Sequence, residues 1–173
     1  SSFQEGLTCV GLNGKYGFID MTGKVVIPLI YDSCFGHFMD GLSCVRLKGK
    51  YGFIDRTGKV VIPLIYDGCD GFKEDLCCVY LNGKSGFIDR TGKVVIPLIN
   101  DFYCGYFRNG LCCVNSKGKH GFIDKTGKVV IPLIYDYCGD FEDGLSRVKV
   151  NNKYGFIDKT GKEVIPLIYD ICD

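Results

Sequence analysis

The chain has 173 residues, of which 46% are hydrophobic and 24% charged, and its formal net charge is +1. This is globular composition, with enough apolar side chains for one core. The near-zero charge gives no basic stripe of the kind that a phosphate backbone needs, so we expect no nucleic-acid partner. The longest apolar run, residues 25–31, is far shorter than the ~20 residues that span a bilayer, so we expect no membrane span.

A repeat organises the whole sequence. One register is occupied by Tyr16, Tyr51, Ser85, His120 and Tyr154, at steps of 35, 34, 35 and 34 residues. A period of about 20 to 50 residues is typical of repeat architectures. We therefore expect a single repeat domain over residues 1–173, with units at residues 3–37, 38–71, 72–106, 107–140 and 141–173.

The second unit illustrates the expected elements. After Phe38, residues 42–47 read as a first strand. Lys48-Gly49 follows in the register where other units have Asn-Gly, which predicts a hairpin turn because Asn and Gly tolerate positive φ. Residues 50–55 form a second strand. The turn at residues 55–58 has Asp first and Gly last, and we favour a plain turn over a calcium loop because it offers a single carboxylate.

The third strand of each unit is apolar on both faces. In the second unit it covers residues 59–62, and residues 64–67 follow Pro63. Two apolar faces predict burial on both sides, while the proline marks an edge or a bend because it cannot donate to a ladder.

One unit alone should not fold, because about 14 large apolar side chains do not offset the ordering of about 34 residues. Stacked neighbours supply the core. We expect an all-β tandem repeat of five three-stranded antiparallel units in an open or spiral array. The alternative is a closed five-unit ring resembling a propeller, against which the short, three-stranded unit argues.

The repeated pattern resembles a known family. Phe-x-x-Gly-Leu-x-x-Val, Gly-Lys-Tyr-Gly-Phe-Ile-Asp, Thr-Gly-Lys-Val-Val-Ile-Pro and Tyr-Asp, in five copies over the whole chain, resemble the bacterial WG-type β-repeat. Where the family has Trp before Gly, this chain has Tyr, Ser or His. The resemblance implies a β-repeat fold and brings no catalytic residues.

Nine of the 11 cysteines follow the repeat. One register, two residues after Tyr-Asp or Asn-Asp, holds Cys34, Cys69, Cys104, Cys138 and Cys172. Another, on the first strand, holds Cys9, Cys44, Cys78 and Cys113, with Arg147 in the fifth unit; Cys77 and Cys112 are extra. These thiols are small apolar fillers, disulfide partners or, as a third option, zinc ligands, although no Cys-x-x-Cys spacing supports zinc.

Two disulfide patterns fit the spacing. Pairing within a unit gives Cys34–Cys44, Cys69–Cys78 and Cys104–Cys113, and leaves Cys9 and Cys172 to pair across a ring seam or between successive molecules. The offset pattern begins with Cys9–Cys34 and continues along the chain. The sequence alone leaves both open.

Catalysis requires residues that break the repeat, and these are few. His120 and Ser85 share one register in neighbouring units, so a Ser–His contact is conceivable, but drift at a partly exposed aromatic position explains them as well. The glycines stand at turns and form no phosphate loop. We predict no enzyme, no catalytic residues, no cofactor and no metal.

Two function classes remain. The first is a structural or protein-interaction module that assembles with itself, end to end, or with another protein. The second is a lectin-like array that binds glycan or cell wall by stacking sugars on Tyr16, Tyr51 and Tyr154, or on the row Tyr31, Tyr66, Tyr135 and Tyr169. The latter row reads better as core aromatics. We expect an extracellular or cell-surface location, with the cytoplasm as the alternative.

Overall fold

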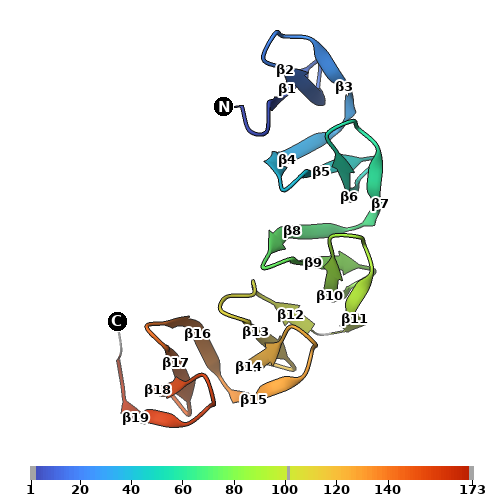
Figure 1. Cartoon of the computed structure of the whole chain (residues 1–173). Helices are drawn as coiled ribbons and strands as arrows, with labels where there is room; N and C mark the ends of the chain where they lie inside the picture. The colour runs from blue at the N-terminus through green and yellow to red at the C-terminus, as the bar shows by residue number, and fades with distance from the viewer. Residues whose placement is uncertain (1–2, 101, 172–173) are drawn as a thin grey trace. The chain divides into compact units, whose positions relative to one another are not determined.

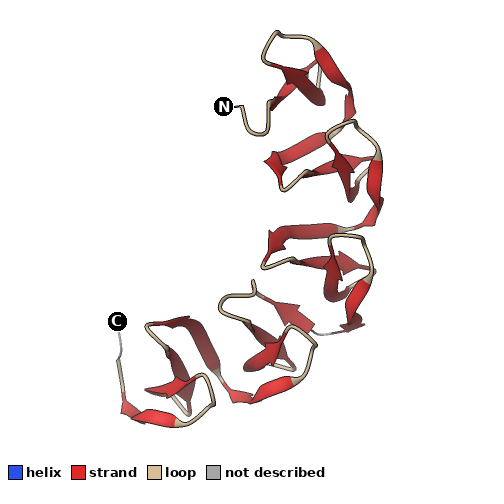
Figure 2. Ribbon diagram, viewed as in Figure 1, coloured by secondary structure: helices blue, strands red, loops and turns tan. Residues whose placement is uncertain are grey.

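The structure, a computed structural model, describes residues 3–100 and 102–171, and over these residues it contains strands and turns and no helix (Figures 1 and 2). No helix that could cross a membrane occurs in this part of the chain. The predicted all-β fold of five antiparallel repeats is confirmed.

The chain divides into two compact units. The first comprises Ser1–Gly71, Val79–Asn82 and Arg90–Gly92, and the second comprises Phe72–Cys78, Gly83–Asp89 and Lys93–Asp173. The first unit begins with a three-stranded sheet in the order β1 (Leu7–Leu12), β2 (Lys15–Asp20) and β3 (Val25–Tyr31). It continues with a four-stranded sheet in the order β4 (Ser33–Met39), β5 (Leu42–Leu47), β6 (Lys50–Asp55) and β7 (Val60–Tyr66).

Three further four-stranded sheets follow in chain order. The third has β8 (Gly68–Lys73), β9 (Leu76–Leu81), β10 (Lys84–Asp89) and β11 (Val94–Asn100). The fourth has β12 (Phe102–Cys104), β13 (Leu111–Ser116), β14 (Lys119–Asp124) and β15 (Val129–Tyr135). The last has β16 (Tyr137–Glu142), β17 (Leu145–Val150), β18 (Lys153–Asp158) and β19 (Glu163–Tyr169).

The predicted hairpins occur where the turn residues require them. Leu47 pairs with Lys50, and the two residues between them, Lys48 and Gly49, have φ of 51° and 79°. Positive φ at both central positions is the geometry of a two-residue hairpin turn. The first two strands of the second repeat, β5 and β6, therefore match the predicted residues 42–47 and 50–55.

The structure adds a strand that the sequence analysis did not predict. In four sheets, a segment that directly follows the third strand of one repeat pairs with the first strand of the next repeat; these segments are β4, β8, β12 and β16. In β4, Cys34 lies opposite Val45. All four segments hold Cys, β8 and β16 also hold Gly and Asp, and none shows clear alternation. Local pattern therefore could not reveal a strand that its partner in the following repeat stabilises.

The third strand is not buried on both sides, and that prediction was wrong. This strand is the last in the order of each sheet. Its sixth residue is 47% to 60% exposed in all five sheets, at Ile30, Ile65, Ile99, Ile134 and Ile168. Its third residue packs inward, and Ile62 is fully buried. Both faces are apolar in sequence, but a strand in this terminal position needs only one of them for the core.

Gly52 allows the second and third strands to approach closely. A Cβ atom at Gly52 would lie 2.6 Å from the backbone oxygen of Ile62 and 2.7 Å from that of Pro63. The pairing of β6 with β7 shifts register between Tyr51 and Phe53. The backbone at this bulge leaves no room for a side chain.

We predict that Gly52→Ala destabilises the protein by about 2 kcal/mol or more, since overpacking against backbone costs roughly 1–3 kcal/mol. Chemical denaturation measures the loss. The matched control is Gly105→Ala, whose Cβ would meet its nearest atom, the oxygen of Cys113, at 3.6 Å. Equal stability of the two variants would contradict the close approach.

Candidate functional site

Three junctions between successive repeats are each formed by a pair of phenylalanines. The ring centroids of Phe18 and Phe38 are 4.8 Å apart, as are those of Phe122 and Phe141, and the spacing for Phe87 and Phe107 is 4.9 Å. The first ring of each pair belongs to the second strand of one repeat, and the other opens the next repeat. Tilted contacts at this distance are favourable beyond the burial of area. We call this contact the repeat joint.

Aliphatic side chains complete each joint. At the joint between the first and second repeats, the buried cluster combines Leu7, Phe18, Ile27 and Tyr31 of the earlier repeat with Phe38, Val45 and Ile54 of the later one. The joint between the last two repeats has the same composition, except that Leu111 is partly buried there and Cys138 joins the buried members. The turn glycine of the later repeat faces the isoleucine of the earlier one: a Cβ atom added at Gly58 would lie 3.4 Å from a methyl group of Ile27.

Each end of the repeat series carries one half of such a joint. We call Phe3, Val10, Ile19 and Gly23 the N-face and Leu145, Phe156, Ile165 and Tyr169 the C-face. Phe3 is 43% exposed, against 1% for Phe38, and Tyr169 is 48% exposed, against 4% for Tyr31. A Cβ atom at Gly23 would meet no described atom within 4 Å. Both faces therefore present joint residues that other repeats bury.

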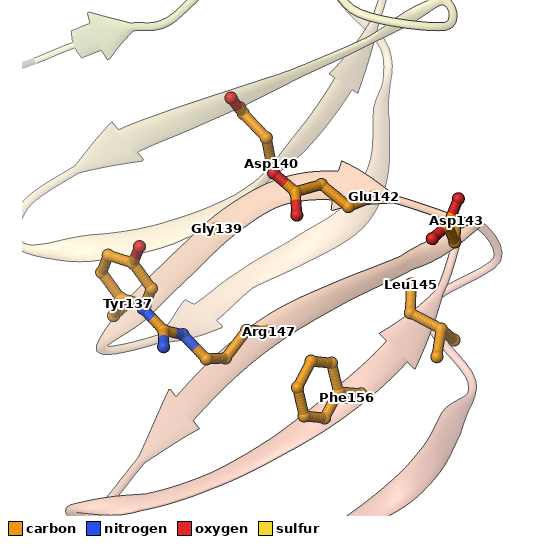
Figure 3. A pocket seen from close by; sticks show the side chains of 8 residues that line it. All are labelled: Tyr137, Gly139, Asp140, Glu142, Asp143, Leu145, Arg147 and Phe156. Atoms are coloured by element: carbon orange, nitrogen blue, oxygen red, sulfur yellow. The ribbon is translucent and has the colours of Figure 1, made fainter. Parts of the chain in front are cut away.

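A pocket of about 640 Å³ opens beside the C-face (Figure 3). Its lining residues are Tyr137, Gly139, Asp140, Glu142, Asp143, Leu145, Arg147 and Phe156. The guanidinium of Arg147 lies 5.6 Å from the ring centroid of Tyr137 and 5.7 Å from that of Tyr154, so its charge is held against two aromatic faces. The pocket is thus lined both by the apolar ring of Phe156 and by the acidic side chains of Asp140, Glu142 and Asp143.

Polar contacts accompany the apolar joint. The carboxylate of Glu5 accepts a hydrogen bond from the backbone nitrogen of Gly41 at 3.1 Å, and Glu74 accepts one from Gly110 at 3.0 Å. Lys125 also pairs with Glu74. In the last repeat, Asp143 occupies the same register as Glu5 and Glu74.

The cysteines follow the offset pattern. Disulfides join Cys9 to Cys34 and Cys78 to Cys104, at sequence separations of 25 and 26. The sulfur atoms of Cys44 and Cys69 are 3.0 Å apart. In the chain-entropy account, a loop of this size is worth about 3.5 kcal/mol per disulfide.

The first of the two predicted patterns, Cys34–Cys44, Cys69–Cys78 and Cys104–Cys113, is therefore wrong. The physical reason is that β4 places Cys34 beside Cys9 of β1, and β12 places Cys104 beside Cys78 of β9. Since Cys9 is bonded to Cys34, it does not form the predicted link with Cys172, which itself lies outside the described residues.

The pair Cys113 and Cys138 differs from the other cysteine pairs in having a histidine beside it. Cys113 and Cys138 are free, and the Cys113 sulfur lies 3.8 Å from Nδ1 of His120. The conceivable Ser–His contact is not among the interactions of His120, whose Nε2 meets Asn115 instead. The Ser85 hydroxyl is buried and has no hydrogen-bond partner in the described part of the chain.

The candidate sugar-stacking tyrosines differ in accessibility. Tyr16 is 37% exposed. The ring of Tyr51 has Arg46 at 5.5 Å and Phe35 at 5.2 Å, and Tyr154 has Lys149 at 5.1 Å as well as Arg147. Side chains of the protein thus already lie against two of these rings. In the other row, Tyr31, Tyr66 and Tyr135 are buried, and burial raises the pKa of Tyr31 and Tyr135.

The aspartate that opens each predicted turn serves the turn itself. One carboxylate oxygen of Asp55 accepts hydrogen bonds from the Thr57 hydroxyl, the Thr57 nitrogen and the Lys59 nitrogen, at 2.6, 2.8 and 3.0 Å. The Thr57 hydroxyl contributes most to lowering the pKa of Asp55, and Asp20, Asp124 and Asp158 repeat the arrangement. The described residues contain no cluster of three or more acidic, His or Cys side chains that could hold a metal.

Sequence reasoning missed the joint and the role of Arg147. The recurring Phe at the start of each unit was the available signal, but its partner lies in the preceding repeat. Arg147 stands in a cysteine register, and the structure places it at the pocket.

Comparison with known families identifies the WG containing repeat. The family model of the WG containing repeat matches residues 16–51, 51–84, 86–119, 121–154 and 154–173. A comparison with curated proteins found no match.

Solved structures show a likeness of fold. Kluyveromyces lactis Hsv2 matches at 10% identity with a TM-score of 0.53, over 94% of this chain and 61% of Hsv2. A form of Hsv2 with its complete loop 6CD matches at 9% identity and 0.54, over 92% and 58%. The chain thus spans about three-fifths of Hsv2, whose β-propeller-like fold is consistent with the closed-ring alternative. A Bacteroides caccae protein of unknown function, at 12% identity over 95% of this chain and 78% of its own, has a TM-score of 0.38, too low for any argument.

The turn aspartates predict acid sensitivity. Their folded-state pKa values lie below the unfolded value of about 3.9, so their stabilisation is complete above that pH and is lost as pH falls through the folded values. We expect the free energy of unfolding, measured by denaturation with urea, to be level near pH 6 and to decline below about pH 4.

The matched variant is Asp55→Asn, which we expect to decline less steeply because it removes one such group. Thr57→Val removes a donor and leaves the carboxylate, so it should also flatten the decline. If the free energy of unfolding of both variants declined with falling pH as steeply as that of the wild type, this assignment would be contradicted.

Proposed function

The chain belongs to the WG containing repeat family, and from this premise we propose that it is a non-enzymatic interaction module that assembles end to end with copies of itself. The occupant of its C-face is the N-face of a second copy. Phe3 of that copy inserts beside Phe156, as Phe38 does beside Phe18.

The single observation that carries this proposal is the division of one joint between the two ends. Internal joints bring together Leu, Phe, Ile and Tyr of one repeat with Phe, Val and Ile of the next. The C-face has the first set, the N-face has the second, and both are partly or largely exposed. A surface that already packs against its own repeat inside the chain is complementary to the same repeat in another chain.

The polar contacts support the same pairing, except that one cation is missing from it. Asp143 stands where Glu5 and Glu74 accept bonds from a turn glycine, and Gly6 of a second copy supplies the corresponding nitrogen. The cation is missing, because Met21 occupies the register in which Arg90 pairs with Asp40 and Lys125 with Glu74. The joint between copies therefore lacks one ion pair.

We further propose an oxidising compartment, outside the cell or at its surface, as the place of action. The disulfides of Cys9 with Cys34 and of Cys78 with Cys104 support this location, because disulfides persist mainly where thiols are not kept reduced.

Sedimentation velocity over a wide concentration range tests assembly. We expect the average mass to grow with concentration, and Phe3→Ala to weaken association roughly 30-fold, as loss of an aromatic anchor worth about 2 kcal/mol requires. The control is Ile134→Ser, which removes a side chain of similar exposure outside both faces. A particle of constant mass, or equal effects of the two variants, would overturn the proposal.

A gain of function provides the sharper test. Met21→Arg restores the cation that internal joints have, so it should tighten association by up to about 5-fold, as expected for an exposed ion pair worth at most about 1 kcal/mol. High salt should remove the gain. Adding Asp143→Asn should also cancel it, because the new guanidinium then has no carboxylate partner.

A further inference from the structure

Four side chains of the fourth repeat form a polar cluster that the assembly surfaces do not use. Cys113 and Asn115 lie on β13, His120 on β14 and Cys138 on β16. The Cys113 sulfur is 3.8 Å from Nδ1 of His120 and 3.8 Å from the backbone oxygen of Cys138. Nδ2 of Asn115 is 2.7 Å from Nε2 of His120. The strand pairing causes this geometry, because Asn115 lies directly opposite His120.

The Asn115 amide sets the tautomer of the histidine. Since an amide nitrogen can only donate, Nε2 of a neutral His120 accepts, and the ring proton resides on Nδ1. That proton faces the Cys113 sulfur. A donor directed at sulfur stabilises the thiolate, which is the nucleophilic form of cysteine.

The pKa values of the two thiols, Cys113 and Cys138, shift in opposite directions. Hydrogen bonding with Cys138, and then with His120, lowers the pKa of Cys113 to about 7, although burial and the charge of Asp140 oppose this. The contact with Cys113, together with burial, raises the pKa of Cys138. One thiol is thus prepared to attack, and its neighbour stays protonated.

We propose that Cys113 is a thiol–disulfide exchange site for low-molecular-weight disulfides, with Cys138 as the resolving thiol and His120 as the positioning residue. The Cys113 thiolate attacks one sulfur of the small disulfide, forms a mixed disulfide and releases the other half as a thiolate. Cys138 then gives up its proton and attacks the Cys113 sulfur, which closes the Cys113–Cys138 disulfide and releases the second half as a thiol. Two electrons pass from the protein thiols to the small disulfide.

The repeat explains why this site occurs once. Cys113 and Cys138 occupy the registers whose members are disulfide-bonded in the first and third repeats, so closing this bond follows a geometry the fold already uses. The histidine register holds Tyr16 in the first repeat and Ser85 in the third, and the fifth repeat has Arg147 in place of the cysteine. Cys113 is also partly exposed, whereas Cys78 is 2% exposed.

The pH dependence of alkylation tests the positioning role. The protein is treated with iodoacetamide in its folded state, and each cysteine is followed by peptide mass spectrometry. We expect the Cys113 rate to have a midpoint near pH 7, and His120→Tyr to move it toward the ordinary value of about 8.5, with roughly a 3-fold lower rate at pH 7. Tyrosine occupies this register in three other repeats, so the variant should fold. An unchanged midpoint would overturn the role of His120.

Cys112 is the internal control, because burial raises the pKa of this thiol on the same strand to about 12. It should stay unmodified while Cys113 reacts. Equal rates would show opening of the protein and would overturn the assignment of a selective site.

Reaction with oxidised glutathione tests the exchange itself. Wild-type protein should form the Cys113–Cys138 disulfide and release two glutathione molecules, while Cys138→Ser should stop at the mixed disulfide on Cys113. Accumulation of the mixed disulfide to the same level in both proteins would overturn the resolving role, and no reaction at Cys113 would overturn the site.

Discussion

The sheets of this protein have an apolar face that their own strands cannot cover, and at the junctions of the first two and of the last two repeats the adjoining repeat covers it. The contact is specific, because a phenylalanine of the later repeat lies against one of the earlier repeat and aliphatic side chains close around both. Stability of such an array depends on neighbour contacts more than on any single unit. The fourth strand has the same origin, since it leaves one repeat and completes the sheet of the next. Repeats are joined by backbone pairing and side-chain packing together, and the cysteine registers meet as a consequence.

Much of this architecture could be predicted from the sequence, because its determinants are local. The period, the Lys48-Gly49 hairpin and the strands around it depend on residues within one unit. The fourth strand depends on a partner in the following repeat, and residues such as Gly68, Cys69 and Asp70 carry no alternation that marks it. The exposure of Ile65 depends on the strand's place in the sheet order, which hydrophobicity does not encode. The apolar composition of the third strand therefore predicted burial of both its faces, whereas its place at the end of the sheet order leaves one face exposed.

For the candidate sites too, the sequence revealed the unusual residues but not their contacts. The cysteine registers could be read from the sequence, but the choice between two pairings required knowing which strands become neighbours. His120 was visible as a break in the repeat, and its interpretation required Asn115 and Cys113, whose positions only the strand register supplies. A repeat protein offers the same scaffold several times, so a single substitution in one copy can give that copy a chemistry that the others lack. His120 in a tyrosine register and Arg147 in a cysteine register are two such substitutions.

The proline of the third strand limits pairing along the edge of each sheet. Pro28, Pro63, Pro97, Pro132 and Pro166 stand exposed at the centre of the terminal strand of each sheet. Proline has no backbone N–H, so a foreign strand laid alongside cannot form an unbroken ladder there, even though exposed valine and isoleucine side chains would attract it. Sideways adhesion is blocked at the same point in every repeat. In the end-to-end assembly that we propose, a further copy could therefore add at the joint faces but not along the edges of the sheets.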